Sequence, residues 1–196
     1  MNRRLTIPLF LILSAVSLVA QAPAGSVPVF EITQGESKVT FFVKASVALT
    51  GVFDKWDGSL VCTSTDPGSC VLDLKVQADS VNTGSGMKDG KLKSEQFFNV
   101  KADPYITFKS TKIAQKGATG FEVVGTFTIR GVSRTETLEL TSAREASSAE
   151  VKGQMAFDRK EYGMTSGIPF IKIADRVEVN VDLKVKRIGP PLDIKN

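Results

Sequence analysis

The amino-acid sequence predicts an all-β fold of about eight antiparallel strands, and three observations support this class. Apolar and polar residues alternate with a period of two through most of the chain after residue 38, which is typical of strands with one dry and one wet face. Turns that contain glycine separate the alternating segments, and no helical periodicity persists for long. Such strands must close on themselves as a barrel or stack as two sheets to bury their apolar faces.

The individual strands follow from the alternation along the chain. The most regular segment covers residues 176–188, where valine and leucine point inward while Glu178 and Asp182 point outward. Turns are expected at residues 116–120 and 130–134, because both segments contain glycine between alternating runs. The expected inward positions are Val39, Phe41, Val43, Ala45 and Val47; Leu72, Leu74 and Val76; Ile106 and Phe108; Phe121, Val123, Gly125, Phe127 and Ile129; Leu138 and Leu140; Val151, Gly153, Met155 and Phe157; and Val177, Val179, Val181, Leu183 and Val185.

Residues 82–98, NTGSGMKDGKLKSEQFF, interrupt the alternation between two predicted strands. A Walker loop or a dinucleotide fingerprint would each need glycine at Asp89, so the glycines and lysines here do not match a known phosphate loop. One or two short helical turns are expected instead. The apolar members could form a plug over one end of the core or a lid over a ligand mouth, and both interpretations stay open. These members are Met87, Leu92, Phe97 and Phe98.

Residues 1–24 predict a secretory signal peptide. Arg3 and Arg4 form a basic start, residues 5–20 are mostly apolar, and small residues follow, with cleavage favoured after Ala24. An uncleaved membrane anchor is the alternative, but the apolar run is shorter than the ~20 residues that a spanning helix requires. Residues 25–196 are then expected to form one domain, in the periplasm or secreted.

The two cysteines, Cys62 and Cys70, predict a disulfide. They flank the turn sequence Asp-Pro-Gly at residues 66–68, so two strands joined by that turn would place the cysteines opposite one another. An exported chain meets an oxidising compartment, which favours the bond. A redox-active pair is the alternative, although such pairs have closer Cys-x-x-Cys spacing.

Charge and composition exclude several classes of function. Without the signal peptide, Lys+Arg falls from 25 to 23 against 21 Asp+Glu, and this net charge of about +2 does not indicate nucleic-acid binding. The chain has no histidine, which excludes Ser-His and Cys-His nucleophile pairs and His-based metal sites. Asp158 and Glu161 beside Arg159 could form a carboxylate pair, but charged residues at a strand end more often form a solvated rim. No catalytic residue, cofactor, metal or further membrane span is therefore expected.

Long ordered motifs carry a family resemblance. SVNTGSGMKDGKLKSEQFFNVKADPYITFKSTKI, followed by GTFTIRGVSRTETLEL, FDRKEYGM and IADRVEVNVDL, strongly resembles the YceI-like family of secreted lipid-binding proteins, from about residue 30 to residue 185. The resemblance implies an eight-stranded antiparallel lipocalin-like barrel with a short helical insertion, whose apolar lumen holds a polyisoprenoid or another long-chain amphiphile. Family members often carry histidine where this chain has Lys91, which leaves open any head-group contact made there.

The expected lumen is apolar, and two of its members are glycines. Gly125 and Gly153 could leave volume for a lipid, or they could mark a packed bend of the barrel where another group approaches closely. The expected lumen residues are Phe41, Val43, Leu74, Met87, Leu92, Phe97, Phe98, Ile106, Phe108, Val123, Gly125, Phe127, Ile129, Gly153, Met155, Phe157, Val179, Val181 and Leu183.

Three functions compete at this point. The favoured one is a non-enzymatic binding protein that carries or stores an isoprenoid or fatty-acyl lipid in the periplasm. The alternatives are an isomerase-like enzyme acting on a lipophilic substrate in the same lumen and a scaffold whose core is full. Neither the lipid nor the oligomeric state follows from the sequence, and a homodimer is one possible assembly.

Overall fold

A computed structural model describes residues 27–46, 48–144, 148–167 and 172–194. The predicted signal peptide and Val47 lie outside the described residues. The described elements are β1 (Val27–Ile32), η1 (Gln34–Glu36), β2 (Lys38–Ala45), β3 (Leu49–Phe53), β4 (Trp56–Cys62), η2 (Pro67–Ser69), β5 (Cys70–Gln77), η3 (Ala78–Ser80), β6 (Val81–Asn82), α1 (Gly86–Lys93), β7 (Tyr105–Lys116), β8 (Gly120–Ile129), β9 (Val132–Arg144), β10 (Ser148–Asp158), η4 (Arg159–Tyr162) and β11 (Ile173–Arg187), with η denoting 3₁₀ turns.

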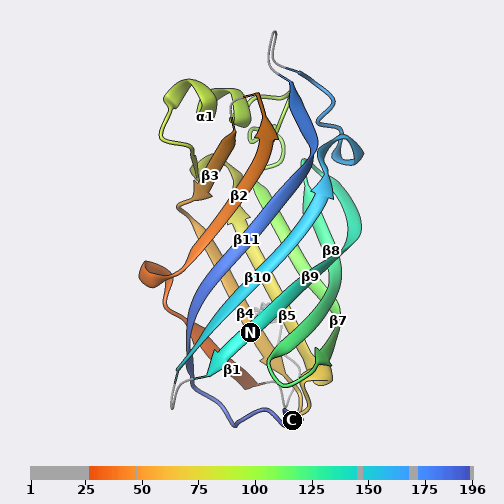
Figure 1. Ribbon diagram of the computed structural model, residues 1–196. Helices are drawn as coiled ribbons and strands as arrows, with labels where there is room; N and C mark the ends of the chain where they lie inside the picture. The colour runs from red at the N-terminus through yellow and green to blue at the C-terminus, as the bar shows by residue number, and fades with distance from the viewer. Residues whose placement is uncertain (1–26, 47, 145–147, 168–171, 195–196) are drawn as a thin grey trace, which may run out of the picture.

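Eight antiparallel strands close into a barrel, which confirms the predicted fold class (Figure 1). The ring runs β1-β4-β5-β7-β8-β9-β10-β11 and returns to β1 through the β1–β11 pairing. Beyond β11 the sheet continues through the short strands β2, β3 and β6, which lie toward the end of the barrel that carries α1. Figure 1 shows α1 at the upper end and the connection between β4 and β5 at the lower end.

Strand β11 is shared by two shorter strands that follow each other in the chain. Its lower part pairs with β1, with Ile32 opposite Val185, and its upper part pairs with β2. Between β1 and β2, the Ser37 hydroxyl donates to Thr33 O at 2.8 Å and accepts from Lys184 N at 2.9 Å. This buried hydroxyl keeps the backbone bonded where the ladder is interrupted.

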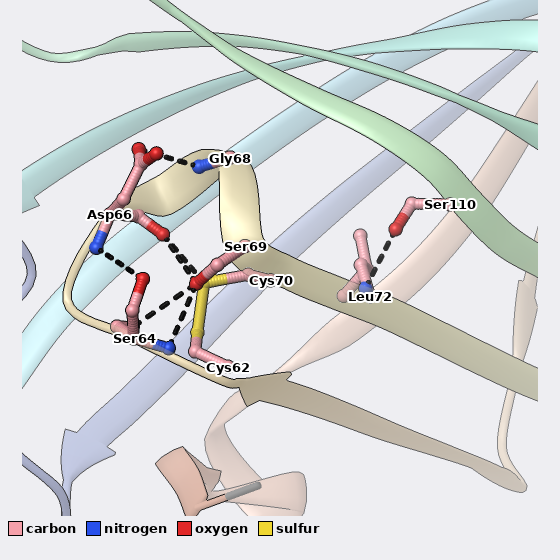
Figure 2. Close-up of a disulfide and its surroundings, with 8 residues drawn as sticks. All are labelled: Cys62, Ser64, Asp66, Gly68, Ser69, Cys70, Leu72 and Ser110. Carbon is pink, nitrogen blue, oxygen red and sulfur yellow. Dashed lines mark hydrogen bonds between the residues drawn. A yellow bond between two sulfur atoms is a disulfide. The ribbon is translucent and has the colours of Figure 1, made fainter.

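Strand β7 contains a bulge that the sequence pattern did not reveal. The β7–β8 register shifts between Ser110 and Lys112, and the β5–β7 ladder reaches only as far as the pair Asp73–Lys109. The buried Ser110 hydroxyl accepts a hydrogen bond from Leu72 N at 2.8 Å (Figure 2). A side chain thus replaces the ladder bond that the bulge removes from Leu72.

The predicted disulfide is present at the lower end of the barrel. Cys62 and Cys70 are directly opposed in the β4–β5 ladder, and their sulfur atoms are bonded (Figure 2). The loop between them is ordered by Asp66, which accepts from Gly68 N at 3.0 Å, and by the Ser69 hydroxyl, which donates to Asp66 O at 2.7 Å. The bond therefore closes a hairpin whose turn is already well hydrogen-bonded.

The insertion holds the expected helix, α1, followed by a non-helical turn. Asp89 anchors the start of α1, because one of its carboxylate oxygens accepts from Thr83 N at 2.8 Å and from Thr83 Oγ1 at 2.7 Å. The hydroxyl bond from Thr83 holds the pKa of Asp89 below its ordinary value. Asp89 is thus committed to a structural contact within the segment.

Candidate ligand cavity in the barrel

Among the described residues, one cavity lies toward each end of the barrel interior. The upper cavity has a volume of about 200 Å³ and lies toward α1. The lower cavity has a volume of about 170 Å³ and lies toward the disulfide. Inward-facing side chains of the alternating strands line both, as the period of two requires.

The upper cavity is lined almost entirely by aliphatic and aromatic side chains. The charged or polar exceptions are Asp57, Lys88, Lys91, Thr107 and Arg159. Its apolar lining residues are Val39, Phe41, Val43, Ala45, Leu49, Phe53, Trp56, Leu74, Val76, Leu92, Phe97, Phe98, Ile106, Phe108, Phe127, Ile129, Leu138, Met155, Phe157, Met164, Ile173, Val177, Val179 and Val181.

The insertion closes the upper end by packing its aromatic residues onto the barrel wall. Phe98 lies 5.9 Å from Phe53 and 6.3 Å from Phe41 between ring centroids, and the rings of Phe41 and Phe53 are 5.6 Å apart. Phe97 and Leu92 are also buried and line the cavity. The segment after α1 is therefore part of the cavity wall.

Met87 corrects one sequence-based expectation. Its side chain is 88% exposed, so it does not line the lumen. The helix α1 is short and polar, and Leu92 is its only buried residue. The side of the helix that carries Met87 therefore faces water. Because this segment has no clear periodicity, the sequence did not indicate whether the Met87 side chain points inward or outward.

A second aromatic cluster packs beside the cavity near the end of β10. The rings of Phe127, Phe157 and Tyr162 lie 5.1–5.5 Å apart. Tyr162 is fully buried, and its hydroxyl donates to Glu136 Oε1 at 2.7 Å. Burial, followed by the bond to Glu136, raises the pKa of Tyr162, so its hydroxyl stays protonated. Tyr162 is therefore a packing residue.

Arg159 borders the upper cavity but is fully engaged by the protein. Its guanidinium donates to Ala174 O at 3.2 Å, to Ser166 O at 3.0 Å and to Met164 O, and it pairs with Asp175 at 3.0 Å. Lys160 also pairs with Asp175, at 2.8 Å. Arg159 thus fastens the segment after η4 to the start of β11 and has little capacity left for a ligand.

The neighbouring carboxylates lie on the barrel rim. Asp158 accepts from Lys160 N at 2.8 Å as a turn cap, and Glu161 pairs with Arg134 at 3.8 Å, with about half of each side chain exposed. Neither residue lines a cavity. The solvated-rim interpretation of this pair agrees with its position.

The lower cavity is covered by the chain that follows β11. Leu192 and Ile194 line it from below. The cover is held by the disulfide loop, because Asp193 N donates to Thr65 O at 2.8 Å and the Thr65 hydroxyl donates to the Asp193 carboxylate. Two of the expected lumen residues, Val123 and Leu183, line this cavity and not the upper one.

The two glycines lie between the cavities, where the interior is tightly packed. A Cβ at Gly153 would fall 2.4 Å from Val181 Cγ2 and 2.6 Å from Leu140 Cδ2. A Cβ at Gly125 would fall 2.6 Å from Lys109 O and 2.7 Å from Phe108 Cζ. Neither glycine lines a cavity, so the expectation that they leave open lumen volume is wrong. Close approach by neighbouring strands occupies the space, as the packed-bend alternative holds.

The remaining expected lumen residues all border the upper cavity: Phe41, Val43, Leu74, Leu92, Phe97, Phe98, Ile106, Phe108, Phe127, Ile129, Met155, Phe157, Val179 and Val181. The lining residues that the sequence did not predict are Leu49, Phe53, Trp56, Met164 and Ile173. Leu49, Gly51 and Phe53 do alternate with polar or smaller residues, but strand β3 has only five residues. A pattern of that length falls below what alternation alone identifies.

Comparison with known proteins identifies the family. A model of the YceI-like domain matches residues 30–185. The chain belongs to the YceI-like family. A UPF0312 protein of Yersinia enterocolitica is 36% identical to this YceI-like protein over 91 residues, which are 46% of this chain and 47% of the relative. A UPF0312 protein of Yersinia pestis is 33% identical over the same length. The matched stretch thus spans about half the length of these relatives.

Solved structures share the barrel fold. BcnA of Burkholderia cenocepacia superposes with a TM-score of 0.72 at 23% identity, covering 79% of this chain and 99% of BcnA. A polyisoprenoid binding domain from Saccharophagus degradans gives a TM-score of 0.63 at 17% identity, covering 82% and 99%. A YceI protein of Campylobacter jejuni gives 0.60 at 21% identity, covering 71% and 85%.

Two features that the described residues lack bear on the site. None of the helices in this part of the chain combines the length and apolarity needed to cross a membrane. Within the same residues, no group of three or more Cys, Asp or Glu side chains is arranged to hold a metal ion.

Proposed function

We propose that this YceI-like protein binds one elongated apolar lipid, an isoprenoid or a fatty-acyl chain, in the upper cavity. The observation that carries the proposal is the lining of that cavity, in which aliphatic and aromatic side chains from the whole circumference of the barrel meet. Very few polar atoms are available to orient a ligand by hydrogen bonds. Such a site selects its ligand by length and shape.

The comparisons support this choice of ligand class. Among the similar folds, one is described as a polyisoprenoid binding domain. Its identity to this chain is 17%, so the inference to this protein rests on the shared fold together with the apolar cavity present here. Each buried methylene contributes ~0.8 kcal/mol to binding. Affinity should therefore rise with chain length until the cavity is full, and then level off.

Carriage or storage of the lipid in the periplasm is the setting that we propose. The order of basic, apolar and small residues in 1–24 supports export, and the Cys62–Cys70 bond suits an oxidising compartment. N-terminal sequencing of the protein from a periplasmic fraction should begin near Gly25. Intact Met1 on protein recovered from the cytosol would contradict export.

Binding without catalysis fits the charged groups at the upper cavity. Arg159 is fully bonded to the protein, and Asp57 accepts from Gln34 Nε2 at 3.1 Å. Lys88 and Lys91 belong to a surface helix at the cavity mouth. Asp57 is the one carboxylate among the described lining residues, and none of the salt bridges in the described part of the chain involves it. Incubation with the bound lipid should return the lipid chemically unchanged. An isomerised product would support the enzyme alternative.

The binding proposal is tested by titrating delipidated protein. Prenyl alcohols and fatty alcohols of increasing length should displace an environment-sensitive fluorescent probe, with affinity rising and then reaching a plateau. A substitution that fills the upper cavity, Val179→Trp, should weaken binding, whereas Val151→Trp, in the lower cavity, should not. If neither prenyl nor acyl chains displace the probe, the proposal fails.

A further inference from the structure

Two lysines of α1 lie at the mouth of the upper cavity. Lys88 and Lys91 both line it, and their spacing of three places them on the same face of the helix. The next lysine, Lys93, does not line the cavity. The mouth thus presents two ammonium groups at one end of an otherwise apolar chamber.

These two ammonium groups are not ion-paired within the described part of the chain. Within the described part of the chain, neither Lys88 nor Lys91 takes part in a salt bridge. The Lys91 ammonium donates to the neutral Gln96 Oε1 and lies 5.7 Å from the centroid of the Phe97 ring. Because Phe97 is buried and lines the cavity, that contact brings the charge to the edge of the apolar chamber.

Two carboxylates close to these lysines in the sequence or in the cavity lining accept hydrogen bonds from other residues. Asp89, between the two lysines in sequence, accepts both hydrogen bonds that Thr83 offers. Asp57 borders the cavity from β4 and accepts from the Gln34 amide. The cation Arg159 is held by three backbone carbonyls and Asp175. Lys88 and Lys91 therefore place two ammonium groups at the mouth that form no salt bridge with a carboxylate of the described residues.

We propose that Lys88 and Lys91 select a lipid with an anionic head group, a carboxylate or a phosphate, whose chain enters the upper cavity. This inference rests on the proposed function. A head group at the mouth would accept charge-assisted hydrogen bonds from one or both ammonium groups, while the chain is held by apolar contact. Neutral lipids of the same length would gain the apolar contact but not the charge-assisted hydrogen bonds.

Matched probes separate the two contributions. Myristic acid with myristyl alcohol, and farnesyl phosphate with farnesol, are titrated against delipidated protein at low ionic strength. We expect each anion to bind about tenfold tighter than its alcohol, as hydrogen bonds to charged groups allow. In the Lys88→Gln/Lys91→Gln variant the ratio of anion affinity to alcohol affinity should fall to within about threefold. Lys93→Gln is the matched control and should retain the preference.

Salt and free anion provide further tests. In the unmodified protein, the preference should shrink as ionic strength rises, because exposed charges are screened; this measurement does not depend on a variant folding. Inorganic phosphate alone should not displace a bound alcohol. If it does, the two lysines bind a free anion and not the head group of a lipid. Equal binding of anion and alcohol would overturn the inference while leaving the proposed function intact. Failure of all four probes would overturn the proposed function itself.

Discussion

Substitution of Gly153 by alanine tests the packing between the two cavities. The added Cβ would lie 2.4 Å from Val181 Cγ2, 2.6 Å from Leu140 Cδ2 and 3.3 Å from Leu138 Cδ1, so three side chains must move. Overpacking of this kind costs ~1–3 kcal/mol. For a chain of this length the melting temperature should fall by about 3–9 °C, at roughly 3 °C per kcal/mol.

The assay is thermal melting of ligand-free protein, combined with a double-mutant cycle. Val181→Ala removes the atom that the new Cβ meets first, so the Gly153→Ala/Val181→Ala protein should be less destabilised than the two single variants added together. Gly35→Ala is the control, because a Cβ there meets nothing within 4 Å. An unchanged melt for Gly153→Ala with no coupling to Val181 would refute the packed layer and imply an open lumen at this level.

Three further predictions concern the ends of the barrel. Replacing Cys62 and Cys70 together by serine should lower the free energy of unfolding by ~2–3 kcal/mol without preventing folding; two free thiols in the unfolded, unreduced protein would contradict the disulfide. Arg159→Met should lower the free energy of unfolding by denaturant by ~2–3 kcal/mol, because buried carbonyl groups lose their donor. Arg159→Lys should recover only part of this loss. An unchanged free energy of unfolding for Arg159→Met would contradict the role of Arg159 in holding the segment after η4. The hydrogen bond from Lys160, followed by its charge and that of Arg159, lowers the pKa of Asp175, so its contribution to stability is complete above the unfolded pKa and is lost as the pH falls through the lower folded value. Asp175→Asn should therefore reduce the loss of stability at acid pH, measured as the free energy of unfolding against pH. An unchanged acid limb would show that Asp175 does not contribute to this pH dependence.

Alternation predicted the barrel because it reports directly which side chains face inward. In β11, Val177 to Val185 are buried or partly buried at every second position, as a strand with one wet face requires. The same rule gave most of the upper cavity lining. It could do so because the lining is simply the inward face of each strand near α1.

Features that depend on register between strands could not be predicted in this way. The close packing around Gly153 arises because Leu140 and Val181 lie opposite it on the two neighbouring strands. The sequence of one strand does not show which residues of other strands lie opposite it. The same limit hid the division into two cavities. It also hid the bulge at Ser110, whose hydroxyl replaces a bond to a residue 38 positions away.

Local exceptions to periodicity account for the other differences. Phe97 and Phe98 are both buried in the turn that follows α1; they were expected in the lumen because they are large and apolar, not because of a period. Met87 shows the reverse, because its short helix buries only Leu92. Strand β1 was not predicted, since Pro28 interrupts a segment of only six residues.

Native mass spectrometry of the protein released gently from the periplasm of its host tests the central claim most directly. We expect a mass above that of the disulfide-bonded chain by one amphiphile, which organic extraction removes and fragmentation identifies as an isoprenoid or acyl lipid. Re-addition of that lipid to extracted protein should restore the mass, and Val179→Trp should prevent it. A bare chain in every preparation, together with no uptake of the lipids present in the same extract, would contradict lipid binding in the upper cavity.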